Sequence, residues 1–241
     1  EFHNLLRSGY QAAQDKYLVT LGIQPTFAAT GYGYIHKGEP VKCFKDRWAF
    51  KVTNFLEKPD NQKAKLMFSS GGYDWNSGMF IWQVDAILEE FKRQMPEFFL
   101  ILEDITKTLL EGNFSEMLPH FWGKIIPQTI DYGIMEHAEN VIVIPGSNLG
   151  WYDVGSWESL FDVMEVDDDG NVNMAVRHIG FETSNTLVYS KSDQHMIVTL
   201  GVENLVIVES DNTILICDRE KSQEIKNVVK FLTDNGLEDY L

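Results

Sequence analysis

Cysteine and basic residues are scarce in this sequence, and both shortages narrow the class of protein. Only two cysteines, Cys43 and Cys217, occur in 241 residues. They lie far apart without partners at zinc-ligand spacing, so neither a disulfide framework nor a structural zinc site is indicated. Lysine and arginine number 20 against 36 aspartates and glutamates, which gives a formal charge of −16. Nucleic acid and anionic membrane surfaces are therefore poor candidate partners.

Long apolar runs are also missing. No run approaches the ~20 residues that a membrane span requires, and the first residues lack the basic-then-apolar order of a signal peptide. We therefore expect a cytoplasmic protein with reduced thiols and no membrane association. The chain does contain 44% hydrophobic and 12% aromatic residues, which is enough for a core in one large domain or two modest ones.

Hydrophobic periodicity predicts alternating helices and strands through the first two thirds of the chain. Helices are expected at residues 2–15, 60–69, from 84 onward, 96–112, 131–138 and 156–163. Strands are expected at residues 17–23, 30–36, 49–56, 75–82 and 141–144. The run at 75–82 is almost continuously apolar, which is typical of a strand covered on both faces. This alternation favours an α/β sheet covered by helices.

The texture changes after the acidic, turn-prone residues 167–170. Short strand-like runs follow over residues 184–218, separated by polar turns, and one amphipathic helix closes the chain with Gly236 as its C-cap. We therefore predict two domains, an α/β domain at residues 1–165 and a small β-rich domain at residues 166–241.

Four segments place polar groups at the ends of buried strands, where open α/β sheets bind ligands. They are TGYGY (30–34), FLEKP (55–59), WNSG (75–78) and GWYDVGSW (150–157). In FLEKP, the Glu57 carboxylate is suited to sugar hydroxyls and the Lys58 ammonium to a phosphate, with about 1.5 to 3 kcal/mol for each charge-assisted bond. The alternative for this pair is a solvated strand end before a proline.

The other candidates each have a structural alternative. Gly33 would let a ligand hydroxyl approach a backbone N–H, but Gly31 and Gly33 also fit a need for unusual dihedral angles. Asn76 is suited to a ligand or to a turn. Asp131 is expected either to cap a helix or to bind a ligand. Asp153 lies between two bulky residues and needs a partner, which Mg²⁺, an N-cap or an arginine would supply.

Taken together and in order, five segments resemble the mannose-1-phosphate guanylyltransferases. The segments are VTLGIQPTFAATGYGYI (19–35), FLEKPD (55–60), WNSGMFIW (75–82), IDYGIMEHAENVIVIP (130–145) and GWYDVGSWESL (150–160). The run GVENLVIVESDNTILI (201–216) is similar to that family's C-terminal module. EKP alone indicates only the wider sugar nucleotidyltransferases, whereas the other segments indicate the guanylyl branch.

The resemblance implies a fold, a reaction and a site. The fold is a partial Rossmann-like nucleotidyltransferase sheet, followed by a small β-helix-like domain that ends in a helix and takes part in homodimer contacts. The reaction converts GTP and mannose 1-phosphate to GDP-mannose and pyrophosphate with Mg²⁺. Asp153 would be one of two metal-binding aspartates. The predicted sugar-phosphate residues are Gly33, Glu57, Lys58 and Asn76, with Asp131 as a further candidate.

One departure from the family pattern affects these expectations. The family's glycine-rich GxGxRLxP-type loop, its guanine-binding strand and its second metal aspartate have no counterpart in the printed sequence. We therefore expect a portion of a longer enzyme, with the catalytic residues upstream. Because that loop follows a central strand, we also expect these 241 residues to be neither well folded nor active alone.

Two other functions stay open at this stage. One is a nucleotidyltransferase for another sugar or base, and pyrophosphate release with different substrates would separate it from the guanylyltransferase. The other is a catalytically silent paralogue that binds a nucleotide sugar and a partner protein. Tight binding of GDP-mannose without pyrophosphate release would favour the silent protein.

Overall fold

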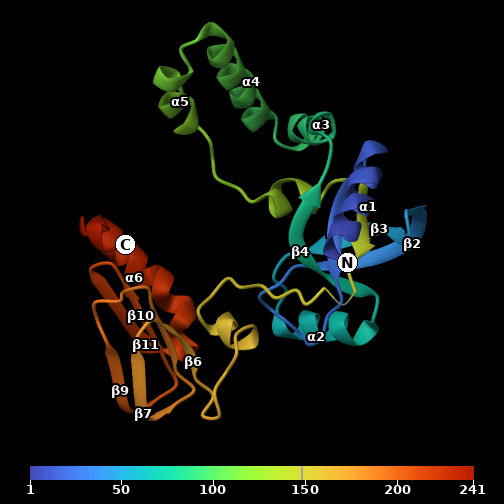
Figure 1. Cartoon of the computed structure of the whole chain (residues 1–241). Helices are drawn as coiled ribbons and strands as arrows, with labels where there is room; N and C mark the ends of the chain where they lie inside the picture. Colours follow the sequence, from blue (N-terminus) through green and yellow to red (C-terminus); the bar gives the residue numbers. More distant parts are fainter. Residues whose placement is uncertain (148) are drawn as a thin grey trace. The chain divides into compact units, whose positions relative to one another are not determined.

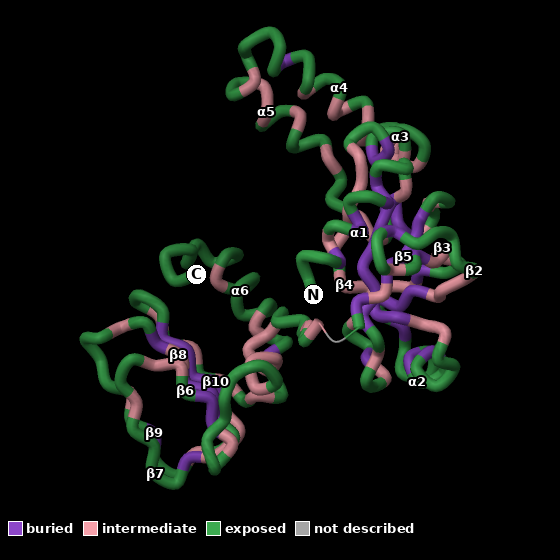
Figure 2. The backbone as a smooth tube through the Cα atoms, turned by 45° about the vertical axis from the view of Figure 1, so that its right-hand side comes forward, coloured by how far each residue is buried: buried purple, intermediate pink, exposed green. Residues whose placement is uncertain are grey.

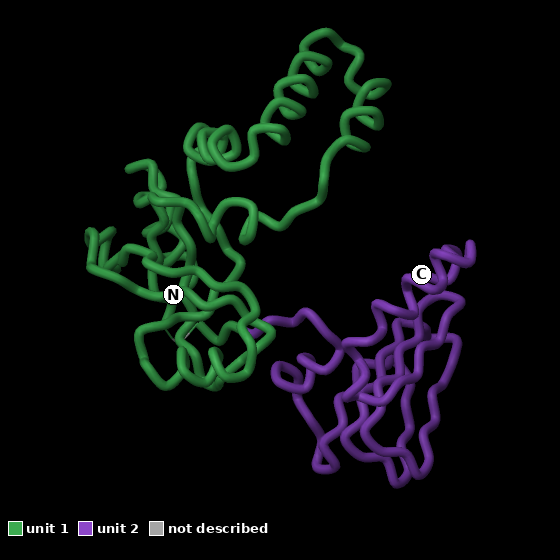
Figure 3. Tube along the Cα trace, turned by 180° about the vertical axis from the view of Figure 1, so that it is seen from behind, with its two compact units in different colours: residues 1–151 green, residues 152–241 purple. Residues whose placement is uncertain are grey.

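The computed structural model describes residues 1–147 and 149–241. The chain forms two compact units, residues 1–151 and residues 152–241 (Figure 3). Each unit has its own hydrophobic core, seen as the buried segments in Figure 2. We placed the domain boundary at residue 165 because the residue composition and the predicted elements change there. Its position stays a prediction.

The first unit is built on a five-stranded sheet that closes on itself. In spatial order its strands are β1 (Leu18–Ile23), β4 (Tyr73–Ile81), β2 (Tyr34–Phe44), β3 (Arg47–Leu56) and β5 (Val141–Pro145). β1 and β5 are parallel, whereas the other pairs are antiparallel. The α/β class is confirmed, but the sheet is closed rather than open. Closure rests on a short pairing in which Phe50 meets Val143 and Lys51 meets Ile142.

Strand β1 lies at the centre of this unit. All six of its residues are buried, as its uncharged sequence LVTLGI predicts. β4 pairs with one edge and β5 with the other. The unpaired backbone that we expect in a partial sheet therefore does not occur at β1. Whether the 241-residue chain folds and works by itself stays a prediction.

Helices accompany the sheet in the order that the sequence predicts. They are α1 (Phe2–Gln14), α2 (Asn61–Ser70), α3 (Val84–Gln94), α4 (Pro96–Glu111) and α5 (Phe114–Trp122), shown in Figure 1. The Asp60 carboxylate caps α2 by accepting from the Lys63 N–H at 2.9 Å. Pro96 begins α4, and Gly112 ends it in a left-handed conformation. Helix α5 was not predicted, because it is short and contains Pro119.

The second unit consists of short parallel rungs. Strands β6 (Val172–Ala175), β8 (Leu187–Ser190) and β10 (Leu205–Ser210) pair in register, and β11 (Thr213–Asp218) adds an antiparallel edge. β7 (His178–Ser184) and β9 (Ile197–Glu203) form a second parallel pair. The helix α6 (Ile225–Asp234) follows, as predicted. This is the expected β-helix-like arrangement.

Side chains of matching position stack from rung to rung in this unit. Val172, Leu187 and Val206 lie opposite one another and are buried. The turns before β8 and β10 place Asn185 and Asn204 at positive φ, a conformation that asparagine tolerates better than most residues. The polar residues between the strand-like runs therefore form the turns between successive strands of the β-helix-like unit.

Several predicted elements differ in detail. The strand expected at 30–36 begins only at Tyr34, and residues 30–33 form a bend instead. The β4 run is only partly buried. The helix expected at 131–138 is a single π-helical turn over Asp131–Met135, and the one expected at 156–163 is a 3-10 turn over Glu158–Asp162. Both segments are too short for local periodicity to specify the helix type.

Candidate functional site

Strand register brings three of the predicted site residues together in the first unit. Tyr34 of β2 lies opposite Trp75 of β4 on one side and opposite Leu56 of β3 on the other. The next residue along each strand is therefore Gly33, Asn76 or Glu57, and these three are neighbours. The Asn76 N–H donates to the Gly33 carbonyl at 2.8 Å. Segments that are far apart in the sequence thus meet at one edge of the sheet.

Gly33 is required at this edge because two side chains crowd it. A Cβ at this position would collide with the Glu57 carboxylate and would lie 3.2 Å from the Asn76 Cβ. Neither Gly31 nor Gly33 has a positive φ, so the alternative based on unusual dihedral angles is wrong for both. Gly33 is buried against its neighbours, whereas Gly31 faces open space.

Hydrogen bonds hold the Asn76 side chain from three directions. Its Nδ2 donates to the Asp131 Oδ1 at 2.9 Å, and its Oδ1 accepts from the Thr20 Oγ1 at 3.2 Å and from the Gly78 N–H at 3.1 Å. Asp131 is the first residue of its π-helical turn, which Ile130 precedes as N-cap. The carboxylate of Asp131 therefore bonds Asn76 and does not cap the turn as the structural alternative predicted.

Glu57 and Lys58 follow the end of β3. The Glu57 side chain is only 15% exposed, whereas that of Lys58 is 63% exposed, with its Nζ 3.8 Å from the Glu57 Oε1. Lys58 has a φ of 48°, an uncommon conformation for a non-glycine residue and one that turns the chain sharply here. The Glu57 N–H donates to the Glu136 Oε1 at 3.4 Å. The loop thus combines a sheltered carboxylate with an exposed ammonium.

Two features of this site were missed at the sequence level. One is Glu136, which follows Asp131 within the same IDYGIME segment and contacts the Glu57 backbone. The other is an aromatic cluster in which Tyr32 lies 4.9 Å from Trp75 and 5.7 Å from Trp151, and Phe27 lies 4.9 Å from Trp75, between ring centroids. The aromatic residues within TGYGY, WNSG and GWYD were the feature of the sequence that could have predicted this cluster. Tyr32 and Trp75 are the chain neighbours of Gly33 and Asn76, so the cluster adjoins the site.

Asp153 belongs to the second unit. Its side chain is exposed, and Tyr152 and Val154 beside it are each 53% exposed. The argument that this carboxylate needs a partner to offset burial is therefore wrong. In the part of the chain that the structure describes, no three His, Cys, Asp or Glu side chains are grouped to hold a metal. A single exposed carboxylate still fits Mg²⁺, which is usually held by one or two carboxylates together with substrate phosphates and water.

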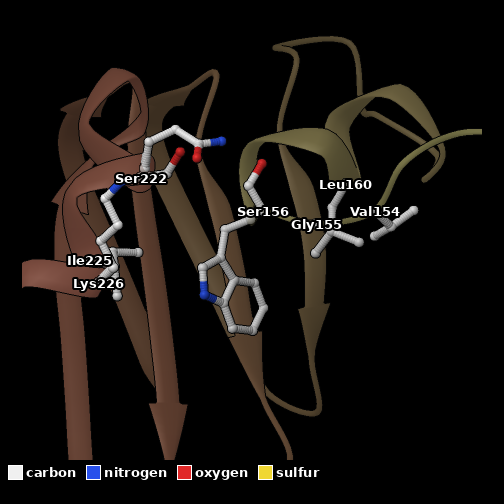
Figure 4. Close-up of a pocket in the computed structure, with 9 residues that line it drawn as sticks. Val154, Gly155, Ser156, Leu160, Ser222, Ile225 and Lys226 are labelled. Atoms are coloured by element: carbon white, nitrogen blue, oxygen red, sulfur yellow. The ribbon is translucent and has the colours of Figure 1, made fainter. Parts of the chain in front are cut away.

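A cavity of about 540 Å³ lies within the second unit, between the segment after Asp153 and the start of α6 (Figure 4). The Ser222 hydroxyl at its wall is buried and has no hydrogen-bond partner among the described residues. Residues of the GWYDVGSW segment form the opposite wall. The lining residues are Val154, Gly155, Ser156, Trp157, Leu160, Ser222, Gln223, Ile225 and Lys226.

Comparison with known proteins agrees with this arrangement. The profile of the family described as nucleotidyl transferase matches residues 1–170. The chain belongs to the nucleotidyl transferase family. A second profile, described as a mannoseP isomerase/GMP-like beta-helix domain, matches residues 176–232. The nucleotidyltransferase and β-helix-like parts predicted from the sequence are thereby confirmed.

Individual relatives of this nucleotidyl transferase carry a more specific name. The mannose-1-phosphate guanylyltransferases of Klebsiella pneumoniae and Escherichia coli are 33% and 34% identical to it over 99% of the chain. That of Salmonella muenchen is 36% identical over 95% of the chain. The chain spans about half the length of these relatives, 47% to 50%. The resemblance predicted from the five segments is therefore confirmed.

A solved structure supports the fold. The structure described as mannose-1-phosphate geranyltransferase from Thermus thermophilus superposes with a TM-score of 0.77 and 32% identity, covering 96% of the present chain and 65% of that chain. Within the described residues, no helix is both long enough and apolar enough to cross a membrane.

Proposed function

We propose that the protein carrying this chain transfers GMP from GTP to mannose 1-phosphate, giving GDP-mannose and pyrophosphate. The observation that carries the proposal is the convergence of Gly33, Glu57, Asn76 and Asp131 at one edge of the first unit's sheet. These residues come from segments that resemble the guanylyltransferases. The names of the relatives support the reaction, and the convergence of these residues supports a sugar-phosphate site at this edge.

The residues of this edge divide the recognition of mannose 1-phosphate between them. The sheltered Glu57 carboxylate accepts hydrogen bonds from sugar hydroxyls, and the Asn76 amide donates one more. The exposed Lys58 ammonium binds the phosphate. The small size of Gly33 leaves room for the Glu57 carboxylate beside it. Holding the phosphate oxygen in line with the α-phosphorus of GTP is the principal contribution of such residues, because the reaction needs no covalent intermediate.

We propose Asp153 as a ligand of Mg²⁺. The support is its exposed carboxylate, which is free to take a cation together with substrate phosphates. Bound Mg²⁺ would neutralise charge that develops on the phosphates of the nucleotide.

We also propose a homodimer that works in the cytoplasm. The support for the dimer is an apolar outer face on the β7 and β9 pair. Ile179 lies opposite Val198 and Phe181 opposite Leu200, and all four are exposed. The inner face of the same pair is polar, since Thr183 and Thr199 are buried and hydrogen-bonded to each other at 2.8 Å. Both cysteines are free thiols, which suits a reducing compartment.

Pyrophosphate release tests the proposed reaction. The purified protein is supplied with GTP, ATP or UTP, and with mannose 1-phosphate or glucose 1-phosphate, in the presence of Mg²⁺. Release that requires GTP and mannose 1-phosphate together is the expected result. A preference for another pair would indicate a different nucleotidyltransferase, and tight GDP-mannose binding without release would indicate a silent paralogue. The 241-residue chain alone is expected to release none, since its sequence has no glycine-rich phosphate loop.

A further inference from the structure

Thr20, a residue that the sequence did not single out, contacts the Asn76 side chain from the centre of the sheet. Thr20 lies in the middle of β1 with no exposed surface, and it is the only polar side chain on that strand. Its hydroxyl donates to the Asn76 Oδ1 at 3.2 Å. A buried hydroxyl without a partner would reduce the stability of the fold, so the bond to Asn76 is favourable. It links a residue in the core of the unit to a residue at the edge of the sheet.

The three partners of Asn76 fix which way its amide points. The Gly78 backbone N–H can only donate, so the atom that it meets must be the amide oxygen. The Asp131 carboxylate accepts when ionised, so the atom that it meets must be the amide nitrogen. The nitrogen has two hydrogens and Asp131 takes one. Among the described residues, the other hydrogen has no hydrogen-bond partner and is available to a ligand.

A bulge in β4 makes this arrangement possible. Thr20 lies opposite Phe80 and Gly22 lies opposite Asn76, so three residues of β4 face the single Leu21 of β1. Gly78 lies in this bulge at a φ of 69°, which a side chain would disfavour. The bulge directs the Gly78 N–H back to the Asn76 oxygen. Bulges commonly re-aim a side chain beside a functional site.

We propose that Thr20 and Asp131 are positioning residues that hold the Asn76 amide in the orientation for binding a sugar hydroxyl. Neither touches the substrate. Asp131, predicted as a substrate residue, instead acts through Asn76. The inference rests on the proposed function, because the proposed function assigns mannose 1-phosphate as the ligand of Asn76. The Asn76 amide can be observed by NMR without turnover, so the positioning of Asn76 and the proposed function can fail separately.

Thr20→Val and Thr20→Ser form a matched pair of variants in the full protein. Valine keeps the branched shape and removes the hydroxyl, whereas serine keeps the hydroxyl. We expect Thr20→Val to raise the KM for mannose 1-phosphate roughly three- to tenfold, the effect of one lost hydrogen bond, with the KM for GTP unchanged. Thr20→Ser should return the KM to near the wild-type value. Thr108→Val, which removes a hydroxyl buried in α4, is the control for general loss of stability.

A double-mutant cycle with Asn76→Ala separates positioning from an independent effect. If Thr20 acts through Asn76, Thr20→Val adds no further loss in the Asn76→Ala background. Additive losses would overturn the inference. So would a Thr20→Val enzyme that matches the wild type, or one whose KM values for mannose 1-phosphate and GTP rise by the same factor.

The side-chain amide of Asn76 gives the readout that needs no turnover. In protein labelled with ¹⁵N-asparagine, Thr20→Val should shift the Asn76 NH₂ resonances and speed their exchange with water, and Thr20→Ser should not. Unchanged resonances in Thr20→Val would overturn the positioning role. If the wild-type protein released no pyrophosphate but the resonances moved as expected, the proposed reaction would fail while the positioning of Asn76 would stand.

Discussion

The carboxylate of Glu57 occupies the space where a side chain on Gly33 would begin. The two residues are side by side because β2 and β3 pair in a register that sets Tyr34 opposite Leu56. We expect Gly33→Ala to push the carboxylate out of its place and to weaken mannose 1-phosphate binding about tenfold, which is the cost of one charge-assisted hydrogen bond. Isothermal titration calorimetry with mannose 1-phosphate measures this loss.

Gly31→Ala is the matched control for that change. A Cβ on Gly31 would meet nothing within 4 Å, and the residue has no positive φ. Its affinity for mannose 1-phosphate should equal that of the wild type. Equal affinities for wild type and Gly33→Ala would show that the contact with Glu57 does not matter to the sugar phosphate.

The metal role of Asp153 can be measured against another exposed aspartate of the same unit. Asp153→Asn keeps the size of the side chain and removes its charge, so the apparent affinity for Mg²⁺ in pyrophosphate release should fall about tenfold or more. Asp168→Asn should leave it unchanged, because Asp168 lies in the exposed acidic turn. Equal Mg²⁺ titration curves for wild type and Asp153→Asn would refute the assignment.

The outer face of β7 and β9 predicts how the dimer can be broken. Phe181 is 58% exposed and lies opposite Leu200, which is 70% exposed. Phe181→Glu would place a charge in this face, and we expect light scattering to show the mass of a monomer. Leu66→Glu, at an equally exposed leucine on α2, should keep the mass of a dimer. A dimer that survives Phe181→Glu would place the interface elsewhere.

Acid should weaken the second unit through His178. Burial lowers the pKa of His178 below its usual 6.5, and the charge of Asp167 opposes this only in part. As the pH falls below about 6.5, the unfolded chain takes up a proton that the folded protein refuses, so stability decreases until the pH reaches the lowered pKa. Urea unfolding at pH 7.5, 6.5 and 5.5 measures this. His178→Gln should show a smaller decrease over that window than the wild type.

Much of the fold follows from local sequence. The uncharged run of β1, the Asp60 cap of α2, and Pro96 and Gly112 at the two ends of α4 each specify an element through nearest neighbours. These features predict where strands and helices lie because backbone preferences and capping act within a few residues. Hydrophobic periodicity extended the prediction to an α/β unit, and the resemblance to a known family added the β-helix-like second unit.

The candidate site could also be predicted only in part from the sequence. Glycine, glutamate and asparagine at strand ends could be proposed as ligands from the sequence, because their chemistry is suited to a sugar phosphate. The sequence did not show that Gly33 is needed for close approach rather than for its dihedral angles. It also indicated the wrong surroundings for Asp153, since two bulky neighbours do not bury a residue when they are themselves half exposed.

The sequence by itself therefore determined most of the strands and longer helices and the residue types that are available for chemistry. Only the tertiary structure decided that Thr20, 56 residues from Asn76, bonds its amide oxygen and that Asp131, 55 residues away, bonds its amide nitrogen. The physical reason is that strand register and a bulge are settled by pairing between distant segments, so they leave no periodic signal along the chain. From its place in the sequence, Asp131 was expected to cap a helix or to bind a ligand. In the structure its carboxylate accepts a hydrogen bond from the Asn76 amide.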